Sequence, residues 1–210
     1  MESLIIPAIQ VDKFKDLQDK LNKARGVAER VQIDVVGEEF ADSKTIGVEE
    51  LARANTSLIM EIQLMVKEPI RYLNRCDVVG IERVYGHVEQ MSDQEEFVES
   101  ASDMGMQVGL GLDIHTPVMA IEKVLPYLDG ALLMSVEVGF SGQGFDEGVF
   151  DKIAELRERD FKGDICVDGG LNRENIEACR EKGANHFAVN STLWKAKDFK
   201  KMYQVLKQAT

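Results

Sequence analysis

The stretch Arg30–Gly37, RVQIDVVG, has the composition of a buried strand and yet carries two polar side chains. Side chains two residues apart in an extended strand point to the same face, so Gln32 and Asp34 share one face. The two valines and the isoleucine that alternate with them occupy the other face. We therefore expect a strand with an apolar side that packs in a core and a polar side that contributes to a functional site.

Seven further stretches share this apolar character and end in turn-forming residues. Apolar residues at helical spacing lie between them, most clearly at 14–24, 118–125, 153–156 and 194–207, and Thr116-Pro117 and Asn172 are suited to begin helices. The eight predicted strands are Leu4–Ile9, Val31–Val36, Leu58–Val66, Asp77–Glu82, Gln107–Asp113, Ala131–Val136, Asp164–Asp168 and His186–Asn190.

The alternation of strands and helices predicts the fold class. Continuously apolar strands, each followed by a helix, are typical of a parallel sheet whose outer face is covered by helices. Eight such units close into a (β/α)8 or TIM barrel, whereas a doubly wound open sheet would favour a G-x-G-x-x-G turn after the first strand. We predict an α/β protein with one (β/α)8 barrel domain over residues 1–210.

The composition limits the partners and the location of the chain. Its 210 residues, 44% of them hydrophobic, suffice for one sizeable core, and no apolar run has the length of a membrane span. No charged and then apolar leader is recognised, so we expect a cytoplasmic protein. The net charge of -12 argues against nucleic acid and anionic membranes as partners. Three cysteines, at 76, 166 and 179, predict no disulfide framework.

Polar side chains stand where the predicted strands end. The reacting groups of a (β/α)8 barrel lie at these ends and in the loops that follow. One such residue alone is usually a solvated loop residue or a satisfied polar group of the core, but the set as a whole predicts a site. Its members are Gln32, Asp34, Gln63, Glu82, Asp113, Glu137, Asp168 and Ser191.

Three loop stretches follow the last three predicted strands, and two of them are rich in glycine. They are 139–144 (GFSGQG), 168–170 (DGG) and 190–192 (NST). Glycine lets backbone N–H groups approach an anion closely, and a helix N-terminus adds partial positive charge. Barrels commonly bind phosphate with their last loops, so we predict a phosphate site at these three stretches.

Several motifs together resemble the ribulose-phosphate 3-epimerase family over nearly the whole chain. The most specific is LLMSVEVGFSGQGF at 132–145, which is followed at the right distance by VDGGLN at 167–172. The other matching stretches are Pro7–Ile9, Gln32–Val35, Gln63–Val66 and Asn190–Ser191. The resemblance implies a phosphate-binding TIM barrel, a phosphorylated sugar as substrate and a homo-oligomer.

The same resemblance implies the roles of individual residues. In that family one aspartate on the second strand and one on the seventh exchange the proton on carbon 3 of the sugar, and these positions are Asp34 and Asp168 here. The implied phosphate contacts come from Gly142, Gly169, Gly170 and Ser191, and the implied sugar contacts from Met65 and Met134. Ala8, Gln32, Gln63 and Asn190 complete the expected substrate site.

The chemistry explains why two carboxylates are needed. Removal of a proton next to a ketone leaves negative charge on the carbonyl oxygen, and a metal or positioned donors must stabilise that charge. Inversion of the carbon then requires an acid on the opposite face, for which two carboxyl groups in different protonation states are suited. Asp34 and Asp168 are therefore the predicted acid–base pair.

The resemblance also implies a divalent metal held by Asp34, Asp168 and two histidines, but Gln32 and Gln63 occupy the histidine positions. A glutamine amide is a weak, neutral ligand, whereas zinc sites use histidine, cysteine and carboxylate, so we expect no tightly bound zinc. Two hypotheses stay open. Either magnesium or manganese is bound among oxygen ligands, or amide N–H groups of the two glutamines bridge the aspartates without a metal.

Other departures from the family pattern leave two functions open. Ala8 replaces a serine, Val36-Gly37-Glu38 replaces methionine-aspartate-glycine, Glu82 falls near the position of a fourth-strand histidine, and Glu137-Val138 replaces asparagine-proline. The retained aspartates favour an isomerase, an epimerase acting on a ketose 5-phosphate or 6-phosphate. The loss of both histidines, of the serine and of the motif after the second strand favours a sugar-phosphate-binding protein without catalysis.

The three histidines are placed by the predicted strands. His87 and His115 are expected in loops on the active face, where either could replace the missing electrophile. His186 begins the last strand and belongs to the opposite end of the barrel.

Overall fold

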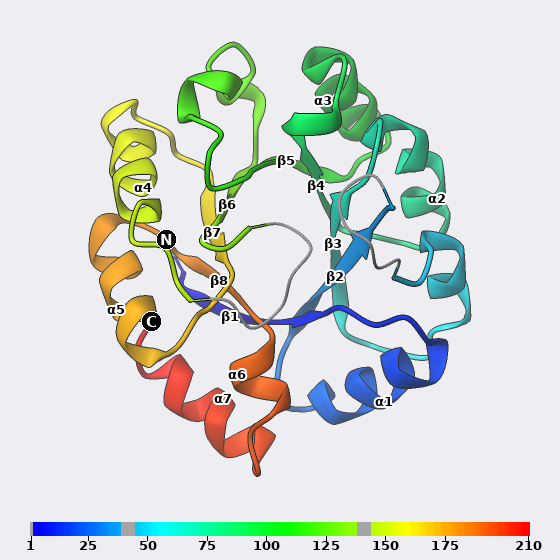
Figure 1. Cartoon of the computed structure of the whole chain (residues 1–210). Helices are drawn as coiled ribbons and strands as arrows, with labels where there is room; N and C mark the ends of the chain where they lie inside the picture. Colours follow the sequence, from blue (N-terminus) through cyan, green and yellow to red (C-terminus); the bar gives the residue numbers. More distant parts are fainter. Residues whose placement is uncertain (1, 39–44, 138–143) are drawn as a thin grey trace.

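The computed structural model describes residues 2–38, 45–137 and 144–210, and within them eight parallel strands form a closed barrel (Figure 1). The strands pair in sequence order and β8 pairs with β1, so the predicted (β/α)8 barrel is confirmed. The strands are β1 Leu4–Ile9, β2 Arg30–Val36, β3 Ile59–Met65, β4 Arg83–His87, β5 Gln107–Leu112, β6 Gly130–Met134, β7 Asp164–Asp168 and β8 His186–Val189.

Helices surround this ring of strands, as Figure 1 shows in a view along the barrel. The α-helices are α1 Phe14–Ala24, α2 Leu73–Val78, α3 Gln94–Asp103, α4 Val149–Glu158, α5 Arg173–Lys182, α6 Ser191–Trp194 and α7 Phe199–Lys207. The 3-10 helices are η1 Val48–Arg53, η2 Pro69–Tyr72, η3 Val88–Gln90, η4 Val118–Ile121 and η5 Leu125–Tyr127. Among the described residues, no helix combines the length and the apolarity that crossing a membrane requires.

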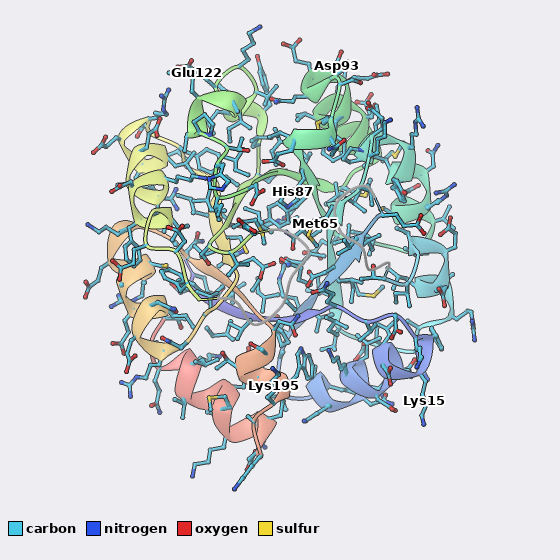
Figure 2. All side chains as sticks on the ribbon, viewed as in Figure 1. Lys15, Met65, His87, Asp93, Glu122 and Lys195 are labelled. Carbon is cyan, nitrogen blue, oxygen red and sulfur yellow. The ribbon has the colours of Figure 1, made fainter. Side chains whose placement is uncertain are left out.

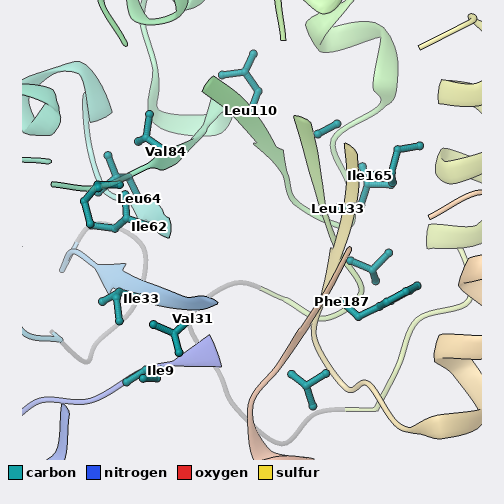
Figure 3. Close-up of a cluster of buried hydrophobic side chains, with 14 of the residues drawn as sticks. Ile9, Val31, Ile33, Ile62, Leu64, Val84, Leu110, Leu133, Ile165 and Phe187 are labelled. Carbon is teal, nitrogen blue, oxygen red and sulfur yellow. The ribbon is translucent and has the colours of Figure 1, made fainter. Parts of the chain in front are cut away.

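Alternation along the strands separates two apolar clusters. In β2, Val31, Ile33 and Val35 point outward and join the large core between strands and helices (Figure 3). A smaller cluster fills the inside of the barrel and includes Ala8, Met65, Tyr85, Met134 and Cys166. Gln32 and Asp34 are buried on this inner side. The period-2 pattern of RVQIDVVG therefore predicted both faces correctly.

The fourth strand differs from the prediction. Asp77–Glu82 is not a strand: Val78 ends α2 with 81% of its surface exposed, and Gly80 turns the chain with a φ of +73°. The strand is Arg83–His87, whose polar ends and internal Gly86 hide its apolar pattern. A side chain at 86 would approach the Phe97 ring to 2.7 Å, so the glycine serves packing against α3.

This correction moves two predicted site residues. Glu82 precedes β4 and forms an ion pair with Arg30, at 2.9 Å, at the N-terminal end of the barrel. His87 is not a loop residue but the last residue of β4, and its side chain is fully buried. A histidine therefore does stand on the fourth strand.

Two helical predictions are also corrected. Over 118–125 the predicted face is buried, but the chain forms the 3-10 helices η4 and η5 instead of one α-helix, and Pro126 in η5 is unfavourable to a longer one. The Thr116 hydroxyl does not cap this segment and donates to Glu89 instead. The predicted helix 194–207 is interrupted after Trp194, and α7 begins anew with Asp198 as its N-cap.

Buried charges fill the N-terminal end of the barrel. Arg83 forms an ion pair with Asp164 at 2.6 Å, and its Nη1 lies 3.1 Å from His186 Nδ1. His186 is thus at the end opposite the strand C-termini, as predicted. The three cysteines are buried free thiols.

Candidate active site

A pocket lies at the C-terminal ends of the strands and contains most of the predicted site residues. It brings the ends of β2 and β7 together with the loops after β6, β7 and β8. Figure 2 shows Met65 and His87 toward the middle of the ring, whereas Lys15 and Lys195 lie at its periphery. The lining residues are Gln10, Asp34, Met65, Met134, Val136, Glu137, Asp168, Gly169, Gly170, Leu171, Ala188, Asn190, Ser191 and Thr192.

Three described residues of the expected substrate site do not line this pocket. Ala8, Gln32 and Gln63 are fully buried inside the barrel. Ala8 packs in the inner apolar cluster, and its carbonyl accepts the Trp194 indole N–H at 2.6 Å. Gly142 lies outside the described residues.

The amide of Gln32 is the centre of a buried polar cluster. Its Nε2 lies 2.9 Å from Asp34 Oδ1 and 3.0 Å from Asp168 Oδ2. The same nitrogen lies 2.9 Å from Gln63 Oε1. One N–H2 group thus holds the two predicted catalytic carboxyl groups and a second amide, which agrees with the bridging hypothesis for Gln32.

Gln63 does not bridge the aspartates, which corrects that part of the hypothesis. Its Nε2 turns to His87 Nε2, at 2.9 Å, and lies 3.2 Å from Met134 Sδ. His87 Nδ1 in turn lies 3.1 Å from Glu89 Oε2. A line of hydrogen bonds therefore leads from Glu89 in η3 through the barrel to the aspartates.

These donors do not fit a tightly bound zinc ion. The Gln32 nitrogen stands among the carboxylate and amide oxygens that would otherwise surround a cation. Two carboxylates and two amides also lack the nitrogen or sulfur ligands that are usual for zinc. Within 2–38, 45–137 and 144–210, no three histidine, cysteine or acidic side chains are grouped to bind a metal.

Burial raises the pKa values of both aspartates. Desolvation raises the pKa of Asp34 to about 6, although the Gln32 amide and the charge of Lys20 act in the opposite direction. Desolvation and then the neighbouring Asp34 charge raise the pKa of Asp168 well above its ordinary value. Two close carboxyl groups do not both ionise readily, so the ionisation of one favours the protonated form of the other.

Two glycines shape the loop after β7. Gly169 and Gly170 have φ angles of +111° and +55°, which favour glycine. A Cβ at 169 would lie 2.6 Å from Val136 Cγ2, and one at 170 would lie 3.0 Å from the Phe145 nitrogen. Both the backbone conformation and the close packing therefore require glycine at these two positions.

Side chains of the surrounding loops hold this turn in place. The Ser135 hydroxyl lies 2.6 Å from the Gly169 carbonyl oxygen. Asn175, part of the capping box that begins α5, donates to the Gly170 carbonyl at 3.1 Å. The Thr192 hydroxyl donates to the Leu171 carbonyl at 2.6 Å and so joins the loops after β7 and β8.

Several residues that line the pocket were not predicted from the sequence. Gln10 and Ala188 could have been found, because Gln10 follows Ala8 by two residues and Ala188 precedes Asn190 by two residues at the strand ends. Leu171 and Thr192 directly follow predicted residues. Glu89 carried no recognisable signal.

Two predicted candidates lie away from the pocket lining. His115 is exposed in the turn after β5. Asp113 begins the same loop, and its carbonyl accepts Lys152 Nζ at 2.6 Å.

Comparisons with known proteins agree with this architecture. Residues 4–194 match the model of the ribulose-phosphate 3 epimerase family. The ribulose-phosphate 3-epimerase of Bacillus subtilis (strain 168) is 34% identical over 205 residues, which cover 94% of each chain. That of Aquifex aeolicus (strain VF5) is 32% identical over 97% of this chain and 95% of the relative.

Solved structures share the fold. A crystal structure of 3-hexulose-6-phosphate synthase superposes with a TM-score of 0.74 over 100% of this chain and 99% of the other. Its sequence is 15% identical to this chain, so the likeness concerns the barrel alone.

Proposed function

Because the chain belongs to the ribulose-phosphate 3-epimerase family, we propose that it inverts carbon 3 of a ketose phosphate with Asp34 and Asp168 as its two acid–base groups. The observation that carries this proposal is the pairing of these carboxyl groups, from the separate strands β2 and β7, on one amide nitrogen. Their raised pKa values support it, since the pair then offers a base and an acid near neutral pH.

The proton transfers balance within the pair. The Asp34 carboxylate removes the proton from carbon 3 and becomes a carboxylic acid, which leaves an enediolate. Asp168 then gives its proton to the opposite face of the carbon and becomes the carboxylate. The turnover leaves Asp34 protonated and Asp168 ionised, which is the starting state of the reverse reaction, and proton exchange with water in the pocket restores the first state.

The enediolate charge requires positioned donors. In this proposal the Gln32 amide, buried between the two carboxyl groups, supplies one of them: an enediolate oxygen that enters there takes an N–H that a carboxyl group otherwise accepts. We propose that the reaction proceeds without a bound zinc ion.

The phosphate is proposed to bind at the loops after β7 and β8. Gly169, Gly170, Leu171, Ser191 and Thr192 line the pocket there, and each carries a backbone N–H. The described part of the lining contains neither lysine nor arginine, so backbone groups are the available donors. This position matches the common phosphate site of (β/α)8 barrels.

Replacement of Gly170 by aspartate is expected to weaken inorganic phosphate binding by about tenfold or more, because a carboxylate and its Cβ enter the cradle. Gly105→Asp is the matched control: Gly105 has a similar φ of +79° and no atom near its would-be Cβ. Calorimetry of the two folded variants gives the comparison. Equal phosphate affinity in wild type and Gly170→Asp would remove these loops as the phosphate site.

Purified protein is expected to contain far less than one zinc ion per chain, since the amides replace stronger ligands. Gln32→His combined with Gln63→His is expected to raise zinc affinity, whereas each single change does little because the ligands act together. Elemental analysis after dialysis measures this. Stoichiometric zinc in the unmodified protein would contradict the metal-free proposal.

The activity itself is tested by incubation with ribulose 5-phosphate and other ketose phosphates, followed by detection of the carbon-3 epimer. We expect conversion of at least one of them. Saturable binding without conversion of any would instead favour the alternative function, a sugar-phosphate-binding barrel, which the replacement of both ligand histidines and of the serine at Ala8 supports.

A further inference from the structure

We propose that Glu89 is a positioning residue: through directed hydrogen bonds it fixes which end of the Gln32 amide faces the two aspartates. The chain of bonds passes through His87 and Gln63. This inference rests on the proposed function, because the series of hydrogen bonds matters only if the Gln32 amide takes part in that reaction.

The direction of the chain is set at Glu89. Its Oε1 accepts the Asp113 N–H at 2.7 Å and the Thr116 hydroxyl at 2.6 Å, and its Oε2 faces His87 Nδ1. Although desolvation opposes ionisation, the hydrogen bond and charge of His87, followed by the Asp113 and Thr116 donors, hold the pKa of Glu89 below its ordinary value. An ionised carboxylate only accepts, so Nδ1 of the imidazole must carry a hydrogen.

Each later bond follows from the one before it. With a hydrogen on Nδ1, His87 accepts at Nε2, to which the Gln63 N–H2 group is turned. The carbonyl end of Gln63 then faces inward and accepts from Gln32 Nε2 at 2.9 Å. The nitrogen end of Gln32 is thereby held at Asp34 and Asp168.

The oxygen end of the Gln32 amide makes no hydrogen bond in the described structure that would fix the orientation of the amide. Its Oε1 is buried and has no hydrogen-bond partner among the described residues. A reversed amide would place this oxygen against the two carboxyl groups, where it repels a carboxylate and cannot serve the enediolate as a donor. The orientation therefore depends on Gln63 and, through it, on Glu89.

Other charges face the aspartates but do not orient the amide. Lys20 of α1 and Glu61 of β3 act on Asp34 through their charge, and Glu61 also acts on Asp168. Neither is hydrogen-bonded to Gln32 in the described structure. The orientation of the Gln32 amide is set by hydrogen bonds from residues of β3 and β4.

Strand β5 leaves room for the His87 imidazole, which is part of this series of hydrogen bonds. Gly111 of β5 pairs with His87 in register, and a Cβ at 111 would lie 2.8 Å from the Nε2 and Cδ2 atoms of the imidazole. The Gly111→Ala variant is therefore a second way to disturb the chain, one that leaves every charged group in place.

Glu89→Gln tests the proposal sharply. The new amide can keep its oxygen toward Asp113 and Thr116, so its nitrogen faces His87 Nδ1 as a donor. We expect the His87 hydrogen to move from Nδ1 to Nε2, which reverses both glutamines. Nitrogen-15 NMR of labelled histidine measures this tautomer. The kcat for epimerisation is expected to fall about 10- to 100-fold while KM stays within about threefold, because the phosphate loops are unchanged.

Glu82→Gln is the control, since it also removes one carboxylate but lies at the N-terminal end of the barrel, and it is expected to keep the wild-type tautomer and kcat. Gly111→Ala, which retains Glu89, is expected to lower kcat like Glu89→Gln and covers the case in which Glu89→Gln fails to fold. A wild-type Nε2–H tautomer, an unchanged tautomer in Glu89→Gln, or a changed tautomer with unchanged kcat would each overturn the proposal. The NMR result is obtained without turnover, so it separates failure of this chain from failure of the proposed activity.

Discussion

Asp168→Asn is expected to lower kcat for ketose-phosphate epimerisation by about 10³-fold or more, and Asp34→Asn is expected to do the same, in keeping with the usual contribution of acid–base groups. Inversion needs a base on one face of carbon 3 and an acid on the other, so the loss of either stops the reaction. Asparagine has nearly the same shape and can still accept the Gln32 N–H, which limits structural effects. Steady-state assays of the folded variants measure the loss.

The control for this experiment is Asp93→Asn. Asp93 is the N-cap of α3, and asparagine serves equally well in that position. We expect wild-type kcat in this variant, and phosphate affinity within about threefold of wild type in all three, since neither site carboxylate is assigned a phosphate contact. Asp34→Asn or Asp168→Asn with near-normal kcat would refute the two-aspartate mechanism.

Asp34→Asn is also expected to stabilise the protein above about pH 6, by an amount on the order of 2–3 kcal/mol. The pKa of Asp34 is about 6 in the folded protein against an ordinary value of 3.8, so between these values the native state binds more protons than the unfolded state. Stability contributed at this site therefore falls as pH rises through that window. Asparagine does not titrate and escapes this penalty.

Urea unfolding of wild type and Asp34→Asn at about pH 4 and about pH 8 measures the effect. The difference in unfolding free energy should be small at the lower pH and should grow in favour of the variant at the higher pH. A constant difference at both pH values would mean that Asp34 ionises normally in the folded chain.

Local sequence patterns predicted most of the fold because the apolar positions that they mark are the positions buried in the folded protein. The alternation in RVQIDVVG matches the two faces of β2, and Asn172 begins α5 as the capping rule predicts. The fourth strand failed for a physical reason: Val78 and Val79 favour a strand locally, but the chain there ends a helix and turns at Gly80. Arg83 and Gly86 are explained only by partners distant in sequence.

Site features that follow from the geometry of a single strand could be predicted from the sequence. Contacts between side chains of two different strands could not. Gln32 and Asp34 share a face of β2 by the geometry of any strand. The orientation of Gln63 depends on β4, because the register that places Gln63 beside Tyr85 also places His87 within its reach. With β4 misplaced in sequence, His87 was expected in a loop, and neither its contact with Gln63 nor its bond to Glu89 could be foreseen.

The most direct test of the proposed mechanism is deuterium incorporation from heavy water into ribulose 5-phosphate by chelator-treated protein. If Asp34 and Asp168 exchange the proton with an amide in the position of a metal, deuterium should appear at carbon 3 at the rate of the untreated protein. Asp34→Asn and Asp168→Asn should each suppress it. Absence of exchange with every ketose phosphate, or exchange that returns only when a divalent metal is added, would contradict this account.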